Sequence, residues 1–417
     1  MPSPDPTIIV IGGGAAGFFA AITCAQALGD RAAVRILEKS SRVLDKVRIS
    51  GGGRCNVTHA CFEPRPLASH YPRGERNLIG PFHAWQPQDT VAWFAERGVK
   101  LKTEADGRVF PVTDDSETVV ACLRRAAHDA GVRVSNETEV SRVDRLAQDR
   151  FRIHTSSDEE IIADALLIAT GGTRSAAARH PVESLGHTLE PATPSLFTFH
   201  IDDARLSGLQ GLSVDPVSLR HPDSGLATEG PLLVTHWGLS GPAVLKLSAL
   251  GARDFAQRNY RFAIEVNWLP QLNEKTARET LNAQRERHGK RAVRTLSPFE
   301  SLPRRLWARL VEHAGIAETT IWSRLPRPES SVLCTQLLRS SFAVTGKSLN
   351  KEEFVTCGGV RLAEVDFKTL ESRLVPGLYF AGEVLDIDGL TGGFNFQSAW
   401  TTAHLAGHAI AQRLAPG

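Results

Sequence analysis

The stretch from Thr7 to Lys39 constrains the fold of this chain more than any other part of the sequence. It reads TIIVIGGGAAGFFAAITCAQALGDRAAVRILEK. The β-branched run at its start predicts a strand, the Ala-rich apolar run to Leu28 predicts a helix, and residues 34–37 predict a second strand. A G-x-G-x-x-G motif lies between the first strand and the helix. In a strand–turn–helix–strand unit this motif predicts a dinucleotide-binding site.

Each glycine of the motif has its own physical role. Gly12 allows a tight turn, Gly14 allows a pyrophosphate to approach the backbone, and Gly17 lets the helix pack against the strand. The helix N-terminus offers free N–H groups and a partial positive charge to the phosphates. Glu38 follows the glycines by about 20 residues, where an acidic side chain accepts hydrogen bonds from a ribose. The alternative is a glycine-rich turn in some other βα unit.

Composition excludes several other classes of protein. A chain of 417 residues is too long for one ordinary core, so we expect two or three domains. Its 48 basic and 46 acidic residues give a net charge of +2, which implies no global attraction to nucleic acid or to anionic membranes. The six cysteines are scattered without a C-x-x-C pair, which argues against disulfides or a metal site and favours a reducing compartment.

The same sequence gives no sign of a membrane protein. No apolar run approaches the roughly 20 residues of a membrane span. The first residues, MPSPDP, lack the basic region and apolar core of a signal peptide. We therefore expect a cytoplasmic protein without a membrane partner.

Residues 51–56, Gly-Gly-Gly-Arg-Cys-Asn, predict a dense polar loop. No strong strand precedes the three glycines, so this segment is not a second dinucleotide turn. Its glycines would allow a cofactor to approach the backbone, and Arg54 or Asn56 would supply hydrogen bonds. A flexible surface loop is the alternative, and the spacing alone fits either.

The region that follows alternates helices and short strands. We expect a hairpin over 104–111 and helices over 86–99 and 115–130, the second capped by Asp114 or Asp115. Four short strands are interpreted as a small β-meander: 132–134, 139–143, 151–154 and 161–164. The apolar strand from Ala165 ends in Ala-Thr-Gly-Gly at Gly172. In flavoproteins of the two-dinucleotide type, such a segment brings backbone to the adenosine half of the cofactor.

The character of the chain changes after about residue 190. Residues 195–266 contain strand-like runs separated by Gly, Pro and Asp, which predict a β-rich insertion. Residues 268–330 show helical patterns with 12 Lys and Arg against 7 Asp and Glu, a net charge of +5, and carry Trp307 and Trp322. This helical insert is either a solvated charged face or a contact surface for RNA or another polyanion.

The C-terminal part returns to the pattern of the first strand and turn. A strand over residues 378–381 ends at Gly382 and Glu383, and a Gly-rich loop enters a helix at about Asn395. This arrangement has the form of a C-terminal flavin clamp, in which an acidic residue bonds the ribityl chain or a phosphate-bridging water. The helix N-terminus then lies near the flavin pyrimidine, where negative charge develops on reduction. We predict that both chain ends close one sheet around one cofactor.

Six segments together resemble the BaiN/RdsA-like flavoproteins, which are predicted NAD(P)/FAD-dependent oxidoreductases. SGGGRCN, THWGLSGPA and GLYFAGEVLDIDGLTGGFNFQ are the most specific of them, and the resemblance covers nearly the whole chain in the same order. It implies an α/β fold, with an FAD-binding Rossmann-like domain of the two-dinucleotide type and with β-barrel-like and small helical insertions. The expected domains are 1–190 with 350–417, 191–267 with 331–349, and 268–330.

The resemblance also implies which residues hold FAD. Together with the motifs above it predicts cofactor contacts at Gly12, Gly13, Gly14, Ala15, Ala16, Gly17, Glu38, Lys39, Lys46, Gly53, Arg54, Cys55, Asn56, Val140, Thr170, Gly171, Gly172, Gly382, Glu383, Gly392, Gly393, Phe394 and Asn395. Many relatives have a longer loop after Gly172 than this chain has. The cofactor contacts that the longer loop makes in relatives are therefore not carried over to this chain. Activities proposed among relatives are reduction of a uridine in ribosomal RNA, steps of bile-acid dehydroxylation, and amine oxidation.

The chemistry belongs to the flavin, and the protein positions the donor and the acceptor. The sequence has no second G-x-G-x-x-G after a strand, so we expect NADH or NADPH to dock transiently at the flavin face. Candidate catalytic residues are His236, as an acid or base, Cys55, whose pKa Arg54 would lower, and Asn56. For His236 a packing role is the alternative, and for Cys55 a buried structural thiol.

Three functions remain open from the sequence. The first is an FAD-dependent reductase, with a base of ribosomal RNA as one concrete acceptor, bound as structured RNA by the helical insert 268–330. The second is a flavin oxidase of a small amine or another small molecule. The third is a non-catalytic flavin-binding module.

Overall fold

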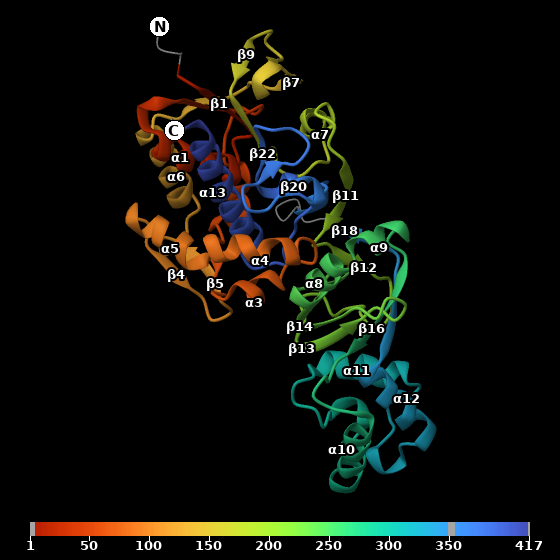
Figure 1. Cartoon of the computed structure of the whole chain (residues 1–417). Coiled ribbons are helices and arrows are strands. Elements are labelled where there is room, and N and C mark those ends of the chain that lie inside the picture. Colours follow the sequence, from red (N-terminus) through yellow and green to blue (C-terminus); the bar gives the residue numbers. More distant parts are fainter. Residues whose placement is uncertain (1–4, 349–354, 416–417) are drawn as a thin grey trace. The chain divides into compact units, whose positions relative to one another are not determined.

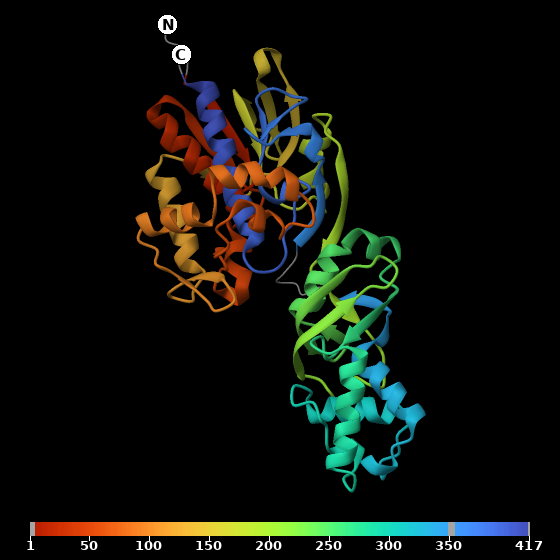
Figure 2. The ribbon, with the colours of Figure 1, turned by 60° about the horizontal axis from the view of Figure 1, so that its bottom comes forward.

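The computed structural model describes residues 5–348 and 355–415. The chain divides into two compact units, which Figures 1 and 2 show in the colours of the sequence. The first unit comprises Met1–Pro194 and Glu352–Gly417, and the second comprises Ser195–Lys351. The predicted boundary at residue 350 lies outside the described residues. The predicted separation of a β-rich insert from a helical insert stays a prediction, since both belong to the second unit.

A seven-stranded sheet forms the centre of the first unit, in the order β20–β21–β22–β10–β1–β2–β6. Its strands are β1 (Thr7–Ile11), β2 (Ala33–Leu37), β6 (Arg133–Ser135), β10 (Ala165–Ile168), β20 (Val365–Asp366), β21 (Glu371–Ser372) and β22 (Leu378–Phe380). The five strands from β22 to β6 run parallel, and β20 and β21 extend the sheet antiparallel. Ile8, Ile9 and Val10 of β1 are fully buried, as expected for a central parallel strand covered on both faces.

The two ends of the chain meet in this sheet and in the helices on it. Strand β10 lies between β1 and β22, and helix α1 (Ala15–Leu28) lies beside α13 (Phe394–Leu414) in Figure 1. Gly407 permits the close approach of the two helices, because a Cβ there would lie 2.7 Å from the carbonyl oxygen of Ala20. The prediction that both ends close one sheet is confirmed.

Two three-stranded sheets and a pair of strands complete the first unit. They are formed by β3 (Thr58–His59), β5 (Arg108–Pro111) and β4 (Leu101–Thr103), by β7 (Val140–Arg145), β8 (Phe151–Thr155) and β9 (Glu160–Ala163), and by β11 (Leu189–Ser195) with β19 (Val355–Val360). The remaining helices are α2 (Asp45–Gly53), α3 (Pro64–Ala68), α4 (Glu75–Ala84), α5 (Pro87–Glu96), α6 (Glu117–Asp129) and α7 (Ala176–Glu183).

The β-meander is real but has three strands, β7 to β9, so the prediction of a fourth was wrong. The segment assigned to it, residues 132–134, overlaps β6, which pairs in parallel with β2 at the edge of the central sheet. The sequence pattern of a short strand is the same in both places. Only the long-range pairing of Ile36 with Val134 decides between them.

The second unit is built on an antiparallel sheet in the order β17–β16–β13–β14–β15–β12–β18. Its strands are β12 (Thr198–His200), β13 (Ser213–Arg220), β14 (Ala227–Val234), β15 (Gly238–Ser240), β16 (Phe262–Asn267), β17 (Ser340–Val344) and β18 (Gly346–Ser348). The edge strands β17 and β18 are separated in the chain by Thr345 alone. The sheet must therefore curl until its two edges approach each other, which gives the barrel-like form expected for the insertion.

The described part of the second unit, residues 195–348, forms five α-helices: α8 (Pro242–Leu250), α9 (Ala252–Gln257), α10 (Glu274–Arg287), α11 (Arg304–His313) and α12 (Arg327–Leu338). Helices α10 to α12 come from the stretch that the sequence predicts to be helical and basic. The core of the second unit is separate from that of the first, and it includes Phe255, Trp268 and Trp307. Every helix in residues 5–348 and 355–415 is too short or too polar to cross a membrane.

Candidate functional site

The glycine turn after β1 is fixed by close packing on two sides. Gly12 has a φ of +113°, and a Cβ there would lie 2.4 Å from the carbonyl oxygen of Ala169 at the end of β10. Gly17 lies still closer to its neighbours, since a Cβ would be 1.9 Å from the carbonyl oxygen of Gly12. These two glycines are therefore required by the fold of the turn itself.

Gly14 differs from both, although it belongs to the same motif. It is the N-cap of α1, and no side chain caps the helix there. A Cβ on Gly14 would meet no atom within 4 Å. The helix thus presents free N–H groups to open space, and this is the cradle that a pyrophosphate requires.

Glu38, at the end of β2, is held against this turn. One carboxylate oxygen accepts a hydrogen bond of 2.7 Å from the N–H of Gly13, and the other accepts one of 2.8 Å from the N–H of Ser40. Beside it lies a cavity of about 60 Å³. The lining residues are Ile11, Gly12, Leu37, Glu38, Lys39, Thr138, Glu139, Val140, Thr170, Ala177 and Ala178.

The structure therefore brings together five residues that the sequence predicts to contact the cofactor: Gly12, Glu38, Lys39, Val140 and Thr170. The hydroxyl of Thr170 is buried and has no hydrogen-bond partner. Buried polar atoms are normally paired, so this orphaned hydroxyl in the cavity wall fits a ligand group. The turn and this cavity together fit a dinucleotide.

Sequence reasoning missed six residues of the cavity wall: Ile11, Leu37, Thr138, Glu139, Ala177 and Ala178. Thr138 reaches the cavity because its N–H donates a 2.8 Å hydrogen bond to the carbonyl oxygen of Glu38. A weak sequence signal was available, since the strand-like segment from residue 139 begins just after this position. No local pattern indicates the alanines of α7.

A second cluster forms where the Ala-Thr-Gly-Gly segment meets the C-terminal strand. The carboxylate of Glu383 forms a 2.5 Å ion pair with Lys46 and accepts a 3.0 Å hydrogen bond from the N–H of Thr356. A Cβ on Gly172 would lie 3.4 Å from the same carboxylate, while Gly171 adjoins open space. Lys46, Gly171, Gly172 and Glu383, all predicted to contact the cofactor, are thus neighbours.

Gly382 links this cluster to the first turn. It has a φ of +74°, and a Cβ on it would lie 2.7 Å from the Cβ of Ala16 in α1. The strand end at Gly382 therefore packs against the helix whose N-terminus forms the cradle.

The three glycines before Arg54 end α2. The assigned helix reaches Gly53, but Ser50, Gly51 and Gly52 have non-helical dihedral angles. Gly51, Gly52 and Gly53 are all left-handed, and added Cβ atoms on the last two would meet nothing within 4 Å. The predicted loop is thus a left-handed extension of a helix, open to an approaching ligand.

Arg54 and Cys55 have different surroundings, and this corrects the prediction that Arg54 lowers the pKa of the Cys55 thiol. Arg54 donates a 2.7 Å hydrogen bond to Glu104 and stacks 3.9 Å above the ring of Phe110. The side chain of Cys55 is fully buried, and burial raises the pKa of its thiol to about 12. The expected lowering of this pKa by Arg54 is wrong, because the guanidinium is engaged by a carboxylate elsewhere.

Asn56 and Asn395 both shape the loop that precedes α13. With the Asn56 amide oriented to satisfy its neighbours, its oxygen accepts a 3.0 Å hydrogen bond from the N–H of Gly393, and its nitrogen donates to the carbonyl oxygens of Thr58 and Val109. The amide of Asn395 binds the backbone N–H and C=O of Gly389 at 2.8 and 3.0 Å. These side chains hold the glycine loop, and their contact with a cofactor stays a prediction.

Phe394, the first residue of α13, is the centre of an aromatic stack. Its ring lies 4.6 Å from that of His59 and 4.2 Å from that of His70, both nearly parallel to it. The hydroxyl of Tyr71 donates a 2.6 Å hydrogen bond to its carbonyl oxygen. Nδ1 of His59 is buried without a partner, and burial lowers the pKa of this imidazole.

Sequence reasoning missed both histidines of this stack. They come from β3 and from the segment between α3 and α4, and no periodic pattern links them to Phe394. Because His59 adjoins Gly392, whose added Cβ would lie 3.5 Å from the ring, the stack lines the glycine loop of the predicted flavin clamp.

His236 belongs to the second unit, in the turn between β14 and β15. The side chain is exposed, and its neighbour Trp237 donates a 3.1 Å hydrogen bond from the indole to the hydroxyl of Thr198. Every other predicted site residue belongs to the first unit. The approach of His236 to the cofactor therefore stays a prediction.

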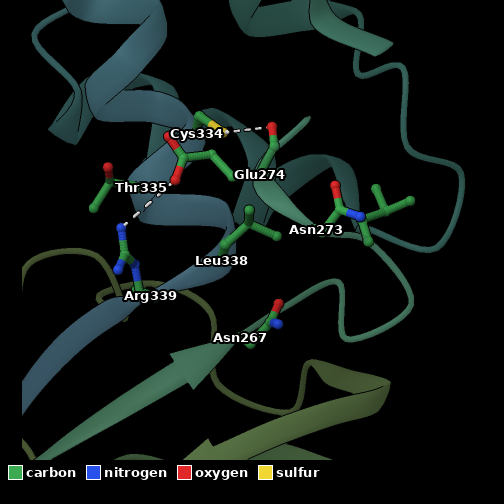
Figure 3. A pocket seen from close by; sticks show the side chains of 8 residues that line it. Asn267, Asn273, Glu274, Cys334, Thr335, Leu338 and Arg339 are labelled. Carbon is green, nitrogen blue, oxygen red and sulfur yellow. Dashed lines mark hydrogen bonds and ion pairs between the residues drawn. The ribbon is translucent and has the colours of Figure 1, made fainter. Parts of the chain in front are cut away.

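The second unit has a cavity of its own, of about 270 Å³, shown in Figure 3. It lies between the end of β16, the start of α10 and the end of α12, with Cys334, Glu274 and Arg339 in its wall. Burial raises the pKa of the Cys334 thiol, and the polar groups around it largely bond one another. Nothing in this wall matches the predicted cofactor site.

Comparison with known proteins decides the family. The family model described as "HI0933-like protein Rossmann domain" matches residues 6–409. The chain belongs to this family. As an HI0933-like protein it is an FAD-dependent oxidoreductase with a Rossmann-type FAD-binding domain, so the reading as a non-catalytic module is wrong.

Two relatives of this HI0933-like protein align with it over nearly its whole length. A "Ribosomal RNA dihydrouridine synthase" of Haemophilus influenzae is 30% identical over 97% of this chain and 98% of its own length. A "3-dehydro-bile acid delta(4,6)-reductase" of Clostridium scindens is 29% identical over 97% of this chain and 98% of its own length. Among solved structures, a 3-ketosteroid-delta4-(5alpha)-dehydrogenase from Rhodococcus jostii RHA1 shares the fold, with a TM-score of 0.50 and 16% identity, over 99% of this chain and 98% of that one.

Proposed function

We propose that this protein is an FAD-dependent reductase that takes electrons from NADH or NADPH and saturates a carbon–carbon double bond of a uracil base in ribosomal RNA. The proposal that ribosomal RNA is the acceptor rests on the relative named as a ribosomal RNA dihydrouridine synthase, which aligns over 97% of the chain. The relative named as a bile-acid reductase supports the reaction class, since both names describe reduction.

The first unit supplies the residues that would hold FAD. The N-terminus of α1 at Gly14 takes the pyrophosphate, and Glu38 takes the adenosine ribose. Glu383, with Lys46, bonds the ribityl chain or a phosphate-bridging water near the flavin. When bound, FAD supplies hydride transfer at its N5 atom.

We propose that the nicotinamide coenzyme binds only transiently. The sequence contains one G-x-G-x-x-G turn after a strand, and FAD occupies it in this proposal. NADH or NADPH would therefore dock at the open flavin face and leave before the acceptor binds. The open surface at Gly52 and Gly53 leaves room for such an approach.

Reduction of a conjugated double bond also requires a proton at the carbon next to the one that accepts hydride. His236 is the proposed acid, because its imidazole is exposed and imidazoles exchange protons near neutral pH. Cys55 is unsuited, because its thiol is fully buried.

The experiment is a turnover assay with the FAD-loaded protein, NADPH or NADH, and unmodified transcripts of the two large ribosomal RNAs under anaerobic conditions. We expect digestion and mass spectrometry to reveal uridine nucleosides that have gained two hydrogens, with coenzyme consumed in equal amount. Omission of the coenzyme is the control. Coenzyme-dependent flavin reduction without any reduced uridine in either transcript would contradict the proposal that ribosomal RNA is the acceptor.

A small-molecule reductase is the second candidate, favoured by the bile-acid reductase among the relatives. The same assay with a steroid enone in place of RNA tests it, and consumption of the enone but not of uridine would favour it. The oxidase reading predicts hydrogen peroxide formed from an amine in air, without any nicotinamide coenzyme.

A further inference from the structure

The C-terminal end of α10 and the short 3₁₀ helix η4 (Trp322–Arg324) form one surface in the second unit. The N–H of Ser323 donates a 3.0 Å hydrogen bond to the carbonyl oxygen of Gly289, and the N–H of Trp322 donates one of 3.0 Å to that of Arg291. Arg285 clamps the same two segments, because its guanidinium donates a 2.7 Å bond to the carbonyl oxygen of Leu325. The two segments therefore present their side chains from one rigid base.

Four basic side chains extend from this base: Arg287, Lys290, Arg291 and Arg324, here called the basic patch. All four are exposed, and within residues 5–348 and 355–415 none of them forms an ion pair or a side-chain hydrogen bond. Three other arginines of the helical insert do form ion pairs: Arg278 with Glu274, Arg294 with Glu318 and Arg309 with Glu312. Glu286 is the one acidic residue between 285 and 291.

Stabilisation of a helix end does not account for this cluster. Basic residues favour the C-terminus of a helix, but the effect falls off within the last turn. Arg287 is the last residue of α10, whereas Lys290, Arg291 and Arg324 lie beyond the helix. Four unneutralised cations on two hydrogen-bonded segments repel one another, and a polyanion would relieve this repulsion.

The basic patch provides positive charge, but the tryptophans of the helical insert are not available to stack on bases. The helical insert has three tryptophans, Trp268, Trp307 and Trp322, and all are buried. Their indole N–H groups donate to the hydroxyl of Ser340 at 3.0 Å and to the carbonyl oxygens of Val293 at 2.8 Å and Leu296 at 3.3 Å. They are core residues and cannot stack on bases, so the patch fits a phosphate backbone and not unpaired bases.

We propose that the basic patch binds the phosphate backbone of the RNA acceptor and positions it, while the base is reduced at the first unit. This proposal rests on the proposed function. Phosphate contacts fix the position and register of a nucleic acid but carry no sequence information. The patch therefore acts on RNA affinity and not on the chemical step.

The test uses the full-length FAD-loaded protein and a fluorescein-labelled ribosomal RNA transcript that the wild type reduces. The patch variant is R287Q/K290Q/R291Q/R324Q. The matched control is R65Q/R124Q/R133Q/K368Q, which removes three arginines and one lysine that are exposed in the first unit. Binding is measured over a series of KCl concentrations, and NADPH oxidation in air without RNA reports the integrity of the flavin site.

We expect the slope of log K against log salt to become shallower by about 3 in the patch variant, since each lost phosphate contact removes about 0.7–0.9. Affinity at moderate salt should fall at least about tenfold. The KM for RNA should rise, with kcat and RNA-independent NADPH oxidation unchanged. The control should match the wild type.

An unchanged salt slope in the patch variant, with uridine still reduced, would contradict RNA binding by the basic patch. The proposed function would not be affected by that result. A wild type that neither binds nor reduces any ribosomal transcript would instead overturn the proposed function, and the patch with it. If the quadruple variant does not fold, the single variants K290Q and R324Q replace it. Each should make the slope shallower by about 0.7–0.9, and an unchanged slope in both would overturn a phosphate contact of the patch.

Discussion

Gly14 and Gly17 are three residues apart in one motif, yet the structure assigns them different tasks. Alanine at Gly14 meets no atom within 4 Å, and its φ of −89° suits any residue. We predict that the apoprotein of Gly14→Ala melts at the wild-type temperature but binds FAD at least about tenfold more weakly, because the methyl group occupies the approach of the pyrophosphate. FAD absorbance after gel filtration measures this.

Gly17→Ala is the matched comparison. Its Cβ would lie 1.9 Å from the carbonyl oxygen of Gly12, so the helix must shift, and such overpacking costs about 1–3 kcal/mol or more. A lowered melting temperature of the apoprotein is the expected result. Full FAD retention in Gly14→Ala would contradict the placement of the pyrophosphate.

Glu383 carries a second prediction at the scale of one residue. Its carboxylate bonds Lys46 and the N–H of Thr356 beside Gly172. Glu383→Ala should reduce FAD affinity roughly ten- to hundredfold, the effect of removing about 1.5–3 kcal/mol of bonding to a charged group. Flavin occupancy of the purified variant is the measurement, with Glu300→Ala in the second unit as control. Unchanged occupancy would refute the role of Glu383.

Helix α13 gives a prediction at the scale of one element. His404 stacks on Trp85 with ring centroids 4.0 Å apart and faces His408 at 4.4 Å. Burial, assisted by the charge of His408, lowers the pKa of His404 from 6.5 to about 4. The unfolded chain binds this proton more tightly, so the contribution of His404 to stability is complete above about pH 6.5 and is lost as the pH falls toward 4.

His404→Gln should therefore flatten the dependence of unfolding free energy on pH between about 6.5 and 4, by an amount of order 1–2 kcal/mol after allowance for solvent screening. Urea unfolding at pH 7 and pH 5 measures it. His128→Gln, on the exposed end of α6, should leave the wild-type dependence intact. An unaltered pH dependence in His404→Gln would contradict the burial of a neutral imidazole.

The glycine loop before α13 depends on Asn56. Asn56→Ala removes the acceptor for the N–H of Gly393 and the donor for two carbonyl oxygens. We predict a loss of about 1–3 kcal/mol in unfolding free energy, the usual cost of unsatisfied buried groups. The urea midpoint checks this, with Asn282→Ala on the exposed face of α10 as control. A wild-type midpoint would show that the loop is held by other bonds.

Elements whose sequence pattern is local were predictable. The β1–α1–β2 unit was predicted correctly, because its hydrophobic periodicity and its glycines act within 35 residues of chain. The partner of β6 was not, because pairing with β2 joins residues about 100 positions apart. The different surroundings of the Arg54 and Cys55 side chains were also not predictable from the sequence, since they follow from three successive left-handed glycines.

At the scale of the whole molecule, one continuous segment, Ser195–Lys351, interrupts a cofactor-binding unit made from both chain ends. The change of composition near residue 190 predicted this interruption. Each unit has its own buried core, so the flavin cradle and the basic patch belong to different units. In our account the first unit performs the chemistry, and the second brings the acceptor to it.

The measurement that tests this account most directly is an anaerobic stopped-flow experiment on the purified yellow protein. NADH or NADPH is mixed first, and a ribosomal RNA transcript or air second. We predict that one coenzyme bleaches the flavin band and that the transcript restores it faster than oxygen does, with reduced uridine formed in equal amount. A flavin that neither coenzyme reduces, or a colourless protein that cannot be reconstituted with FAD, would contradict the account.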